Sequence, residues 1–94
     1  MNENKNKCTI LGFKTYYEKD KQTGRETDKE MLRIIICVDG KDDYTGKVPV
    51  PVYLESNPML INDLKMAIDS NKEITYITEE NIATQKTKVV KLEF

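Results

Sequence analysis

The chain of 94 residues contains no histidine and no tryptophan, and it has only two cysteines. Histidine is the commonest general base in enzymes and a frequent zinc ligand, so its absence argues against acid–base catalysis and against a zinc site. A glycine-rich phosphate loop, a dinucleotide fingerprint and a nucleophile elbow are absent as well. We therefore expect a protein that is not an enzyme and that binds neither a metal nor a cofactor.

Long apolar runs and a strong net charge are also missing. No segment approaches the roughly 18 apolar residues of a membrane span, and the polar first residues resemble no secretory signal. We expect no membrane contact, a cytoplasmic location and free thiols. The 15 basic and 16 acidic side chains give a formal net charge of −1, whereas nucleic-acid binders usually have a high pI. Any nucleic-acid binding must therefore depend on where individual cations lie.

The length corresponds to one domain, with a flexible tail over residues 1–7 and a single folded unit over residues 8–94. The stretch Met31–Asp39 alternates between apolar and mixed positions, which predicts a β-strand with one fully buried face. That face consists of Leu32, Ile34, Ile36 and Val38. The opposite face carries a cation, Arg33, beside Ile35, so we interpret it as a candidate binding surface.

A second strand is predicted over Cys8–Tyr17, with Leu11 and Phe13 facing the core and Gly12 marking a bulge. The loop Lys21–Gly24 joins the two strands as a hairpin, because Gly24 tolerates a left-handed backbone. This loop predicts a register in which paired residue numbers sum to about 45. The predicted pairs are Phe13 with Leu32, Leu11 with Ile34, Lys14 with Met31, and Cys8 with Cys37.

The strand Lys47–Glu55 also alternates, with valines facing inward and Pro49, Pro51 and Tyr53 facing outward. Prolines of the same parity remove amide hydrogens from one side of the strand, which predicts an edge strand. Next, Ser56-Asn57-Pro58 predicts a helix start, and an apolar stripe predicts a helix over Pro58–Ser70 that ends at Asn71.

Two further strands are predicted over Glu73–Thr78 and Lys86–Phe94, joined by a turn at Glu79–Ala83. In the last strand Val90, Leu92 and Phe94 are expected to face inward and Val89 outward. Five short strands with one helix between the third and the fourth are typical of the OB-fold, a small Greek-key barrel. An open sheet backed by one helix is the alternative architecture.

Basic and aromatic side chains gather on the outward face that this barrel predicts. Single-stranded nucleic acid binds to tyrosine rings on which bases stack, beside cations that follow the phosphates. The candidates are Lys14, Tyr16, Arg33, Ile35, Lys47 and Tyr53, with Tyr44 as a further ring and Lys21 and Arg25 at the hairpin tip. Alternatively, Tyr16 and Tyr17 brace a twisted hairpin, and the charges at the tip, which include four acidic residues, serve solubility.

A charged hairpin that leads into an apolar strand ending in Val38-Asp39-Gly40 resembles the small single-stranded DNA-binding proteins of phages and mobile elements. Those of filamentous phages are the nearest comparison, and the likeness covers roughly Cys8–Leu54. The resemblance implies an OB-fold, a homodimer, and DNA contacts by Tyr16, Arg25 and Arg33. The slightly acidic composition departs from that family.

Two functions remain open. The first is a sequence-tolerant single-stranded DNA-binding protein, with RNA as a further ligand, acting in the replication or recombination of a phage or plasmid. The second is a protein-binding module that modulates a host protein, favoured by the near-neutral charge and by apolar outward residues. Those residues are Met31, Ile35 and Val89, which could equally form a homodimer seam.

Overall fold

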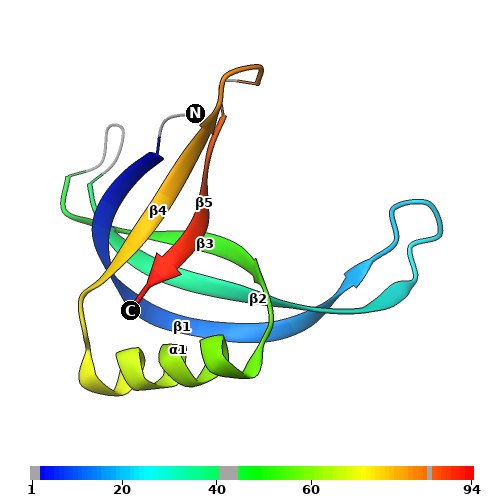
Figure 1. Cartoon of the computed structure of the whole chain (residues 1–94), viewed down its shortest axis with the longest axis horizontal. Helices are drawn as coiled ribbons and strands as arrows, with labels where there is room; N and C mark the ends of the chain where they lie inside the picture. The colour runs from blue at the N-terminus through cyan, green and yellow to red at the C-terminus, as the bar shows by residue number, and fades with distance from the viewer. Residues whose placement is uncertain (1–2, 41–44, 85) are drawn as a thin grey trace.

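A computed structural model describes residues 3–40, 45–84 and 86–94. It is mainly β, with five antiparallel strands and one helix (Figure 1). The elements are β1 (Glu3–Lys19), β2 (Glu26–Asp39), β3 (Lys47–Glu55), α1 (Pro58–Ser70), β4 (Ile74–Asn81) and β5 (Lys86–Glu93). This order of strands and helix is the one that the sequence predicts.

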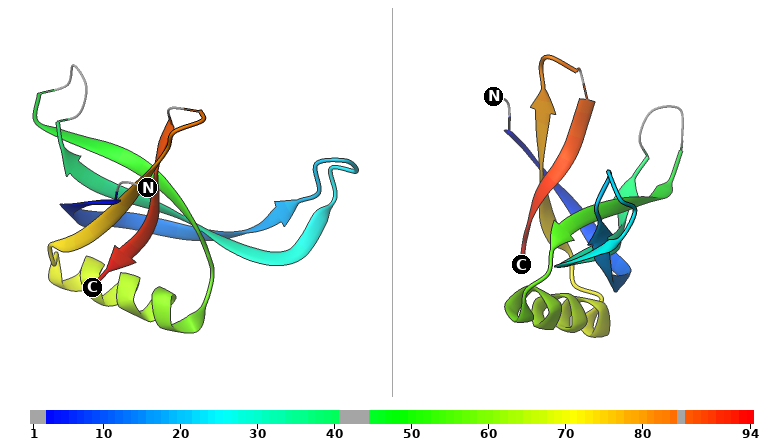
Figure 2. Two further views of the ribbon diagram at one scale, coloured as in Figure 1. Left: turned by 45° about the horizontal axis from the view of Figure 1, so that its top comes forward. Right: turned by 90° about the vertical axis from the view of Figure 1, so that its right-hand side faces the viewer.

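The strands form one sheet in the order β3-β2-β1-β4-β5, with β3 and β5 as its two edges. The long strand β1 joins the two halves, because Glu3–Cys8 pair with β4 and Thr9–Lys19 pair with β2. Among the described residues no strand pairing joins β3 to β5, so the sheet is open. Figure 2 shows the two halves diverging above α1, which lies at their base.

The pairing of β1 with β4 corrects the prediction of a flexible tail for residues 3–7, whereas residues 1 and 2 of that predicted tail lie outside the described residues. Lys5 lies opposite Ile77 and Lys7 opposite Thr75, and Lys7 Nζ donates a hydrogen bond to Thr75 Oγ1 at 3.3 Å. The polar residues of this stretch predict a tail because they show no alternation of apolar and polar positions that would indicate a strand. Their partner strand lies far along the chain, and it supplies the hydrogen bonds that hold them.

The bulge predicted at Gly12 is confirmed, and it changes which residues of β1 face the core. Ile10 pairs with Ile36 but Gly12 pairs with Ile35, so Leu11 is an extra residue in β1. An extra residue changes which face of the strand the preceding side chains point to. Ile10 is consequently buried, and Leu11 is 55% exposed. The prediction that Leu11 faces the core is therefore wrong.

The hairpin turn is also confirmed. Gly24 has a φ of 71°, and the Gly24 amide donates to the Asp20 carbonyl at 2.7 Å. A second irregularity between Tyr17 and Lys19 then shifts the register by two residues. Phe13 faces Ile34, Lys14 faces Arg33 and Thr9 faces Cys37, so the predicted pairs are wrong by one or two positions. Where the shift is two residues it preserves the inward and outward faces, because side chains alternate with period two.

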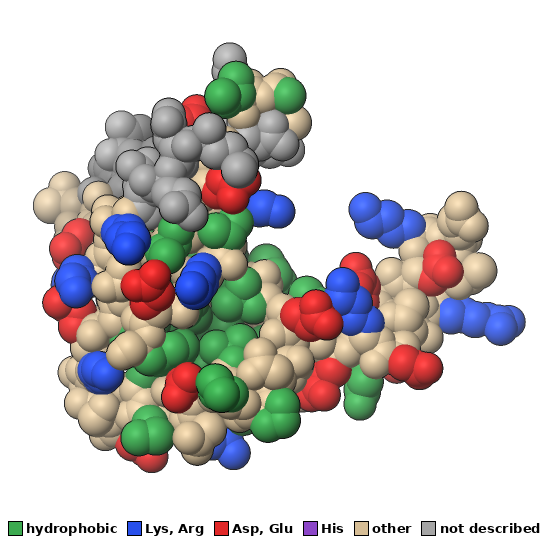
Figure 3. Space-filling view, viewed as in Figure 1, with side chains coloured by type: hydrophobic (Ala, Val, Ile, Leu, Met, Phe, Trp, Pro, Cys, Tyr) green, Lys and Arg blue, Asp and Glu red, His purple; other side chains and the backbone are tan. Residues whose placement is uncertain are grey.

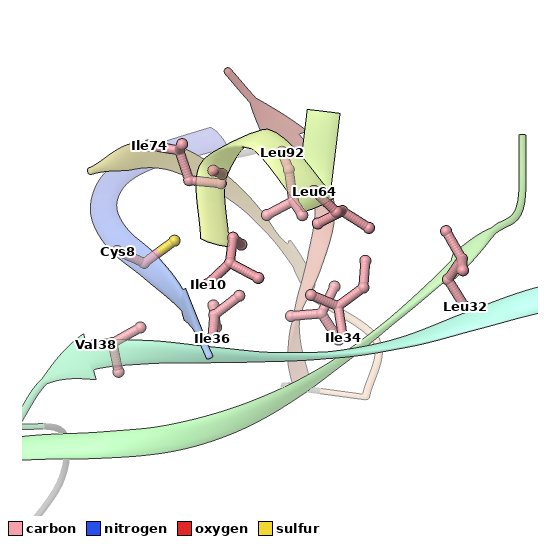
Figure 4. Packing of buried hydrophobic residues seen from close by; sticks show 11 residues of the cluster. Cys8, Ile10, Leu32, Ile34, Ile36, Val38, Leu64, Ile74 and Leu92 are labelled. Carbon is pink, nitrogen blue, oxygen red and sulfur yellow. The ribbon is translucent and has the colours of Figure 1, made fainter. Parts of the chain in front are cut away.

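The helix has the predicted bounds and caps. The Asn57 side chain accepts a hydrogen bond from the Leu60 amide at 2.8 Å, and Asn71 ends the helix in a left-handed conformation with φ 50° and ψ 42°. Leu64 and Ala67 face the core from α1, where they meet the inward side chains of β1, β2, β4 and β5 (Figure 4). The helix thus fills the space between the two halves of the sheet at one end.

The second half of the sheet differs in detail from the prediction. β4 continues to Asn81 through the predicted turn, and a shift in register makes Val90 an extra residue of β5. Val89 therefore packs against the core, whereas the sequence predicts that it faces outward. Leu92 and Phe94 face the core as predicted. No helix in the described part of the chain is long and apolar enough to cross a membrane.

Candidate nucleic-acid interface

Two cations and an aromatic ring form a row across three strands on the outer face of the sheet. Lys14 of β1 lies opposite Arg33 of β2, and Arg33 lies opposite Tyr53 of β3. The inward neighbours Ile34 and Val52 are buried, so the row necessarily faces away from the core. Lys14 and Arg33 are exposed and the Tyr53 side chain is 52% exposed. Both charges and the ring are available to a ligand.

A second tyrosine supports this row. The rings of Tyr16 and Tyr53 meet edge to face, with centroids 6.5 Å apart and an interplanar angle of 87°. Such pairs are stabilised by the ring quadrupoles and hold both rings in fixed orientations. Tyr16 is half-buried, so it braces Tyr53, as cross-strand packing predicts for it. Tyr53 keeps the larger open surface for stacking.

A shallow depression lies next to Arg33 on the same face. It is lined by Phe13, Lys14, Arg33 and Ile35, and the residue opposite Ile35 on β1 is Gly12. A Cβ at Gly12 would meet no atom within 4 Å, so the missing side chain leaves Ile35 open on that side. The depression combines an apolar floor with two cations. A planar base beside a phosphate fits this combination.

Lys47 does not belong to this group. Its Nζ donates to Asp39 Oδ1 at 2.6 Å, and this hydrogen bond and the charge of Asp39 raise the pKa of Lys47. Asp39 stands six residues beyond Arg33 on β2, which corresponds to about 20 Å along a strand. Lys47 is therefore paired with Asp39 and distant from the row of Lys14, Arg33 and Tyr53.

Lys21 and Arg25 are also separate from the row. The end of the β1–β2 hairpin projects from the body as an arm (Figure 1), and residues 17–29 of it are exposed. Acidic and basic side chains alternate on the arm (Figure 3), and Lys29 Nζ lies 3.5 Å from Glu18 Oε2. The arm carries no concentrated positive charge. Tyr44 lies outside the described residues.

The two cysteines lie on neighbouring strands, where Cys37 pairs with Thr9, the residue next to Cys8. Cys8 is buried on the core face, and Cys37 is half-buried. Burial, followed by the charges of Cys37 and Glu73, raises the pKa of Cys8 to about 11, so its thiol stays protonated at neutral pH. In the described part of the chain no cluster of three His, Cys, Asp or Glu side chains forms that could hold a metal ion.

A larger groove, which the sequence does not predict, lies between the two halves of the sheet. Its volume is about 1150 Å³, and residues of all five strands line it. It exists because β1 coils from one half of the sheet to the other while β3 and β5 stay unpaired at this end. The groove could have been predicted only from the pairing of residues 3–8 with β4, which is a long-range contact that the sequence does not indicate.

Compared with known protein families, curated proteins and solved structures, the chain gives no match.

Proposed function

We propose that this protein binds single-stranded DNA, without strict sequence preference, on the outer face of β1, β2 and β3. The observation that carries the proposal is the row of Lys14, Arg33 and Tyr53, in which two exposed cations stand beside a half-exposed ring. Stacking of one base on an aromatic side chain contributes about 1–3 kcal/mol. The cations add an electrostatic contribution that releases counterions from the phosphates.

The fold supports this proposal as a variant of the OB-fold. The sheet is open, but β1 pairs with both β2 and β4, and α1 lies between β3 and β4 in the chain, an arrangement compatible with a variant of the small OB-type barrels. Proteins of that type bind oligonucleotides on the face formed by their second and third strands. The protein would then act like the small single-stranded DNA-binding proteins of phages and mobile elements that the sequence resembles.

A titration with a fluorescent oligo(dT) at several salt concentrations tests the proposal. Binding should weaken as salt rises, and the logarithmic slope should fall by about 0.7 for each phosphate contact removed from a single strand. Arg33→Gln and Lys14→Gln should each lower the slope by about that amount. Lys65→Gln, on the exposed side of α1, is the matched control and should keep the slope of the unaltered protein. Absence of any anisotropy change at low salt refutes DNA binding on this face.

A second candidate is protein contact on the same face, either with another copy of the chain or with a different protein. Ile35 is half-buried and pairs with the exposed Pro51, and Met31 is half-buried one row beyond Arg33. Exposed apolar surface of this kind marks protein contacts. Sedimentation of the protein and of Ile35→Glu discriminates this candidate, since a dimer through Ile35 should dissociate in the variant. Identical sedimentation of the two proteins excludes a dimer through Ile35.

A further inference from the structure

The groove between the two halves of the sheet has one strongly apolar wall. That wall consists of inward residues of β2 and β3, of which Ile36, Val38 and Val52 are buried in the core and Val50 is partly exposed. Tyr76 and Val89 stand in the opposite half. Hydrophobic side chains gather at the centre of the view in Figure 3, near the crossing of β5 and β3. The partly exposed Val50, Tyr76 and Val89 are therefore the apolar surface that a flat, weakly polar group can reach between the two halves.

The charge of the groove residues is positive although the whole chain is slightly acidic. Three lysines line the groove, Lys5, Lys7 and Lys88, against a single carboxylate, Asp39. Asp39 is already bonded to Lys47 at 2.6 Å. Lys7 Nζ donates to Thr75 Oγ1 at 3.3 Å, and Lys5 Nζ is paired with Glu93 Oε1 at 4.0 Å. Neither partner lines the groove, so both amines point toward its rim and Lys7 is the one of the two that is not paired with a carboxylate. A polyanion with apolar parts is complementary to this arrangement.

The groove is continuous with the outer face. Tyr53 lines the groove and also contacts Tyr16 on the outer face, because β3 is an edge strand with nothing paired beyond it. A chain lying on Lys14, Arg33 and Tyr53 can thus pass over the edge of β3 into the groove. This continuity favours single-stranded nucleic acid over an acidic peptide as the occupant.

We propose that the groove is a second segment of the nucleic-acid path, in which rim lysines bind phosphates and the partly exposed side chains of Tyr76, Val50 and Val89 receive bases. This inference rests on the proposed function, which it extends from the outer face across Tyr53. The single strand then bends around the edge of β3. The protein covers more nucleotides than the outer row alone could contact.

Charge removal at the rim tests the inference in the full chain. Lys7→Gln/Lys88→Gln should lower the logarithmic salt slope for an oligo(dT) of about 16 nucleotides by about 1.4, since two phosphate contacts are lost. Lys65→Gln/Lys72→Gln, which removes two cations outside the groove, should leave the slope unchanged. An unchanged slope in the groove variant, together with a lower slope in Arg33→Gln, overturns the inference while the outer-face function stands.

A fluorescent reporter provides a second measurement. Because the chain has no tryptophan, Thr87→Trp places a single tryptophan at an exposed position of the groove. Oligo(dT) should quench it, and should not quench Met66→Trp on the exposed side of α1. Quenching of Thr87→Trp by a short oligoglutamate but not by oligo(dT) assigns the groove to acidic peptides and overturns the inference. Absence of oligonucleotide binding by the unaltered protein refutes the proposed function as well.

Discussion

Replacing Tyr53 by alanine is the sharpest single test of the outer face, because the chain contains a matched control. Tyr53 is 52% exposed and Tyr17 is 50% exposed, so each truncation removes a similar amount of partly buried ring. The two rings differ in their surroundings. Tyr53 stands beside Arg33 and contacts Tyr16, whereas Tyr17 lies opposite Glu30 on the arm.

The expected magnitude follows from stacking. Loss of one stacked base costs about 1–3 kcal/mol, which corresponds to an increase in Kd of about 5- to 150-fold for Tyr53→Ala. Tyr17→Ala should change Kd by less than about twofold, because that ring has no cation row beside it. Tyr53→Phe should bind like the unaltered protein, since it keeps the stacking ring and loses only the hydroxyl.

Anisotropy with a labelled oligo(dT) at low salt measures these affinities, and thermal unfolding monitors the fold. Tyr53→Ala also loses the edge-to-face contact with Tyr16, worth about 0.5–1.5 kcal/mol of stability, so binding is compared well below the unfolding temperature of each variant. Equal losses of affinity in Tyr53→Ala and Tyr17→Ala would refute the reasoning. Such a result would mean that the position of the ring relative to Arg33 does not matter.

Three further predictions concern stability and thiol chemistry. Asn57→Ala should lower the free energy of unfolding by about 1 kcal/mol in denaturant titrations, because the Leu60 amide loses its hydrogen-bond acceptor. Asn57→Asp should retain the stability of the unaltered protein. An unchanged unfolding midpoint in Asn57→Ala would contradict the capping role of Asn57. Leu64→Ala should cost about 2–5 kcal/mol by the same measurement, since the side chain is fully buried and leaves a cavity; a cost below about 1 kcal/mol would show that the core collapses around it. Burial raises the pKa of Cys8 to about 11, against 9.0 for the unperturbed thiol, so the fold favours the neutral thiol. The contribution of the buried Cys8 thiol to stability is therefore complete below pH 9 and is lost as the pH rises toward 11. Alkylation followed by mass spectrometry at pH 8 should therefore modify Cys37 well before Cys8, and equal rates would contradict the burial of Cys8.

Features set by a few neighbouring residues could be predicted from the sequence. The bounds of α1 follow from Asn57, Pro58 and Asn71, whose capping preferences act within one turn of helix. The turn at Gly24 is equally local, and the prolines of β3 restrict that strand to a sheet edge wherever the rest of the sheet lies. These signals depend on backbone geometry and not on distant partners.

Features that depend on the partner strand could not be predicted. A bulge at Gly12 is visible in the sequence, but which neighbour becomes the extra residue depends on how β2 pairs, and this decides whether Ile10 or Leu11 is buried. The same holds for Val89 and Val90 in β5. One extra residue moves the side chains beyond it to the opposite face of the strand. The alternation of apolar and polar residues therefore predicts which side chains face the core only within a segment that contains no bulge.

The candidate site shows the same division. Alternation in each strand predicts that Lys14, Arg33 and Tyr53 share one face, and the pairing of the three strands aligns them in a row. Lys47 satisfies the alternation too, but its distance from Arg33 and its bond to Asp39 appear only in the structure. The groove residues Lys5 and Lys7 were missed because a polar segment gave no reason to expect a strand there.

The double pairing of β1 also constrains the order in which the molecule folds. Residues such as Lys7 and Thr75, which pair across β1 and β4, are separated by 68 positions in the chain. The β1–β2 hairpin and β3 can assemble from segments that are close in the chain, whereas the pairing of β1 with β4 has to bring together segments that are far apart. Contacts at such sequence separation slow folding, so a temporarily unpaired N-terminal strand is where a refolding experiment should find the late step.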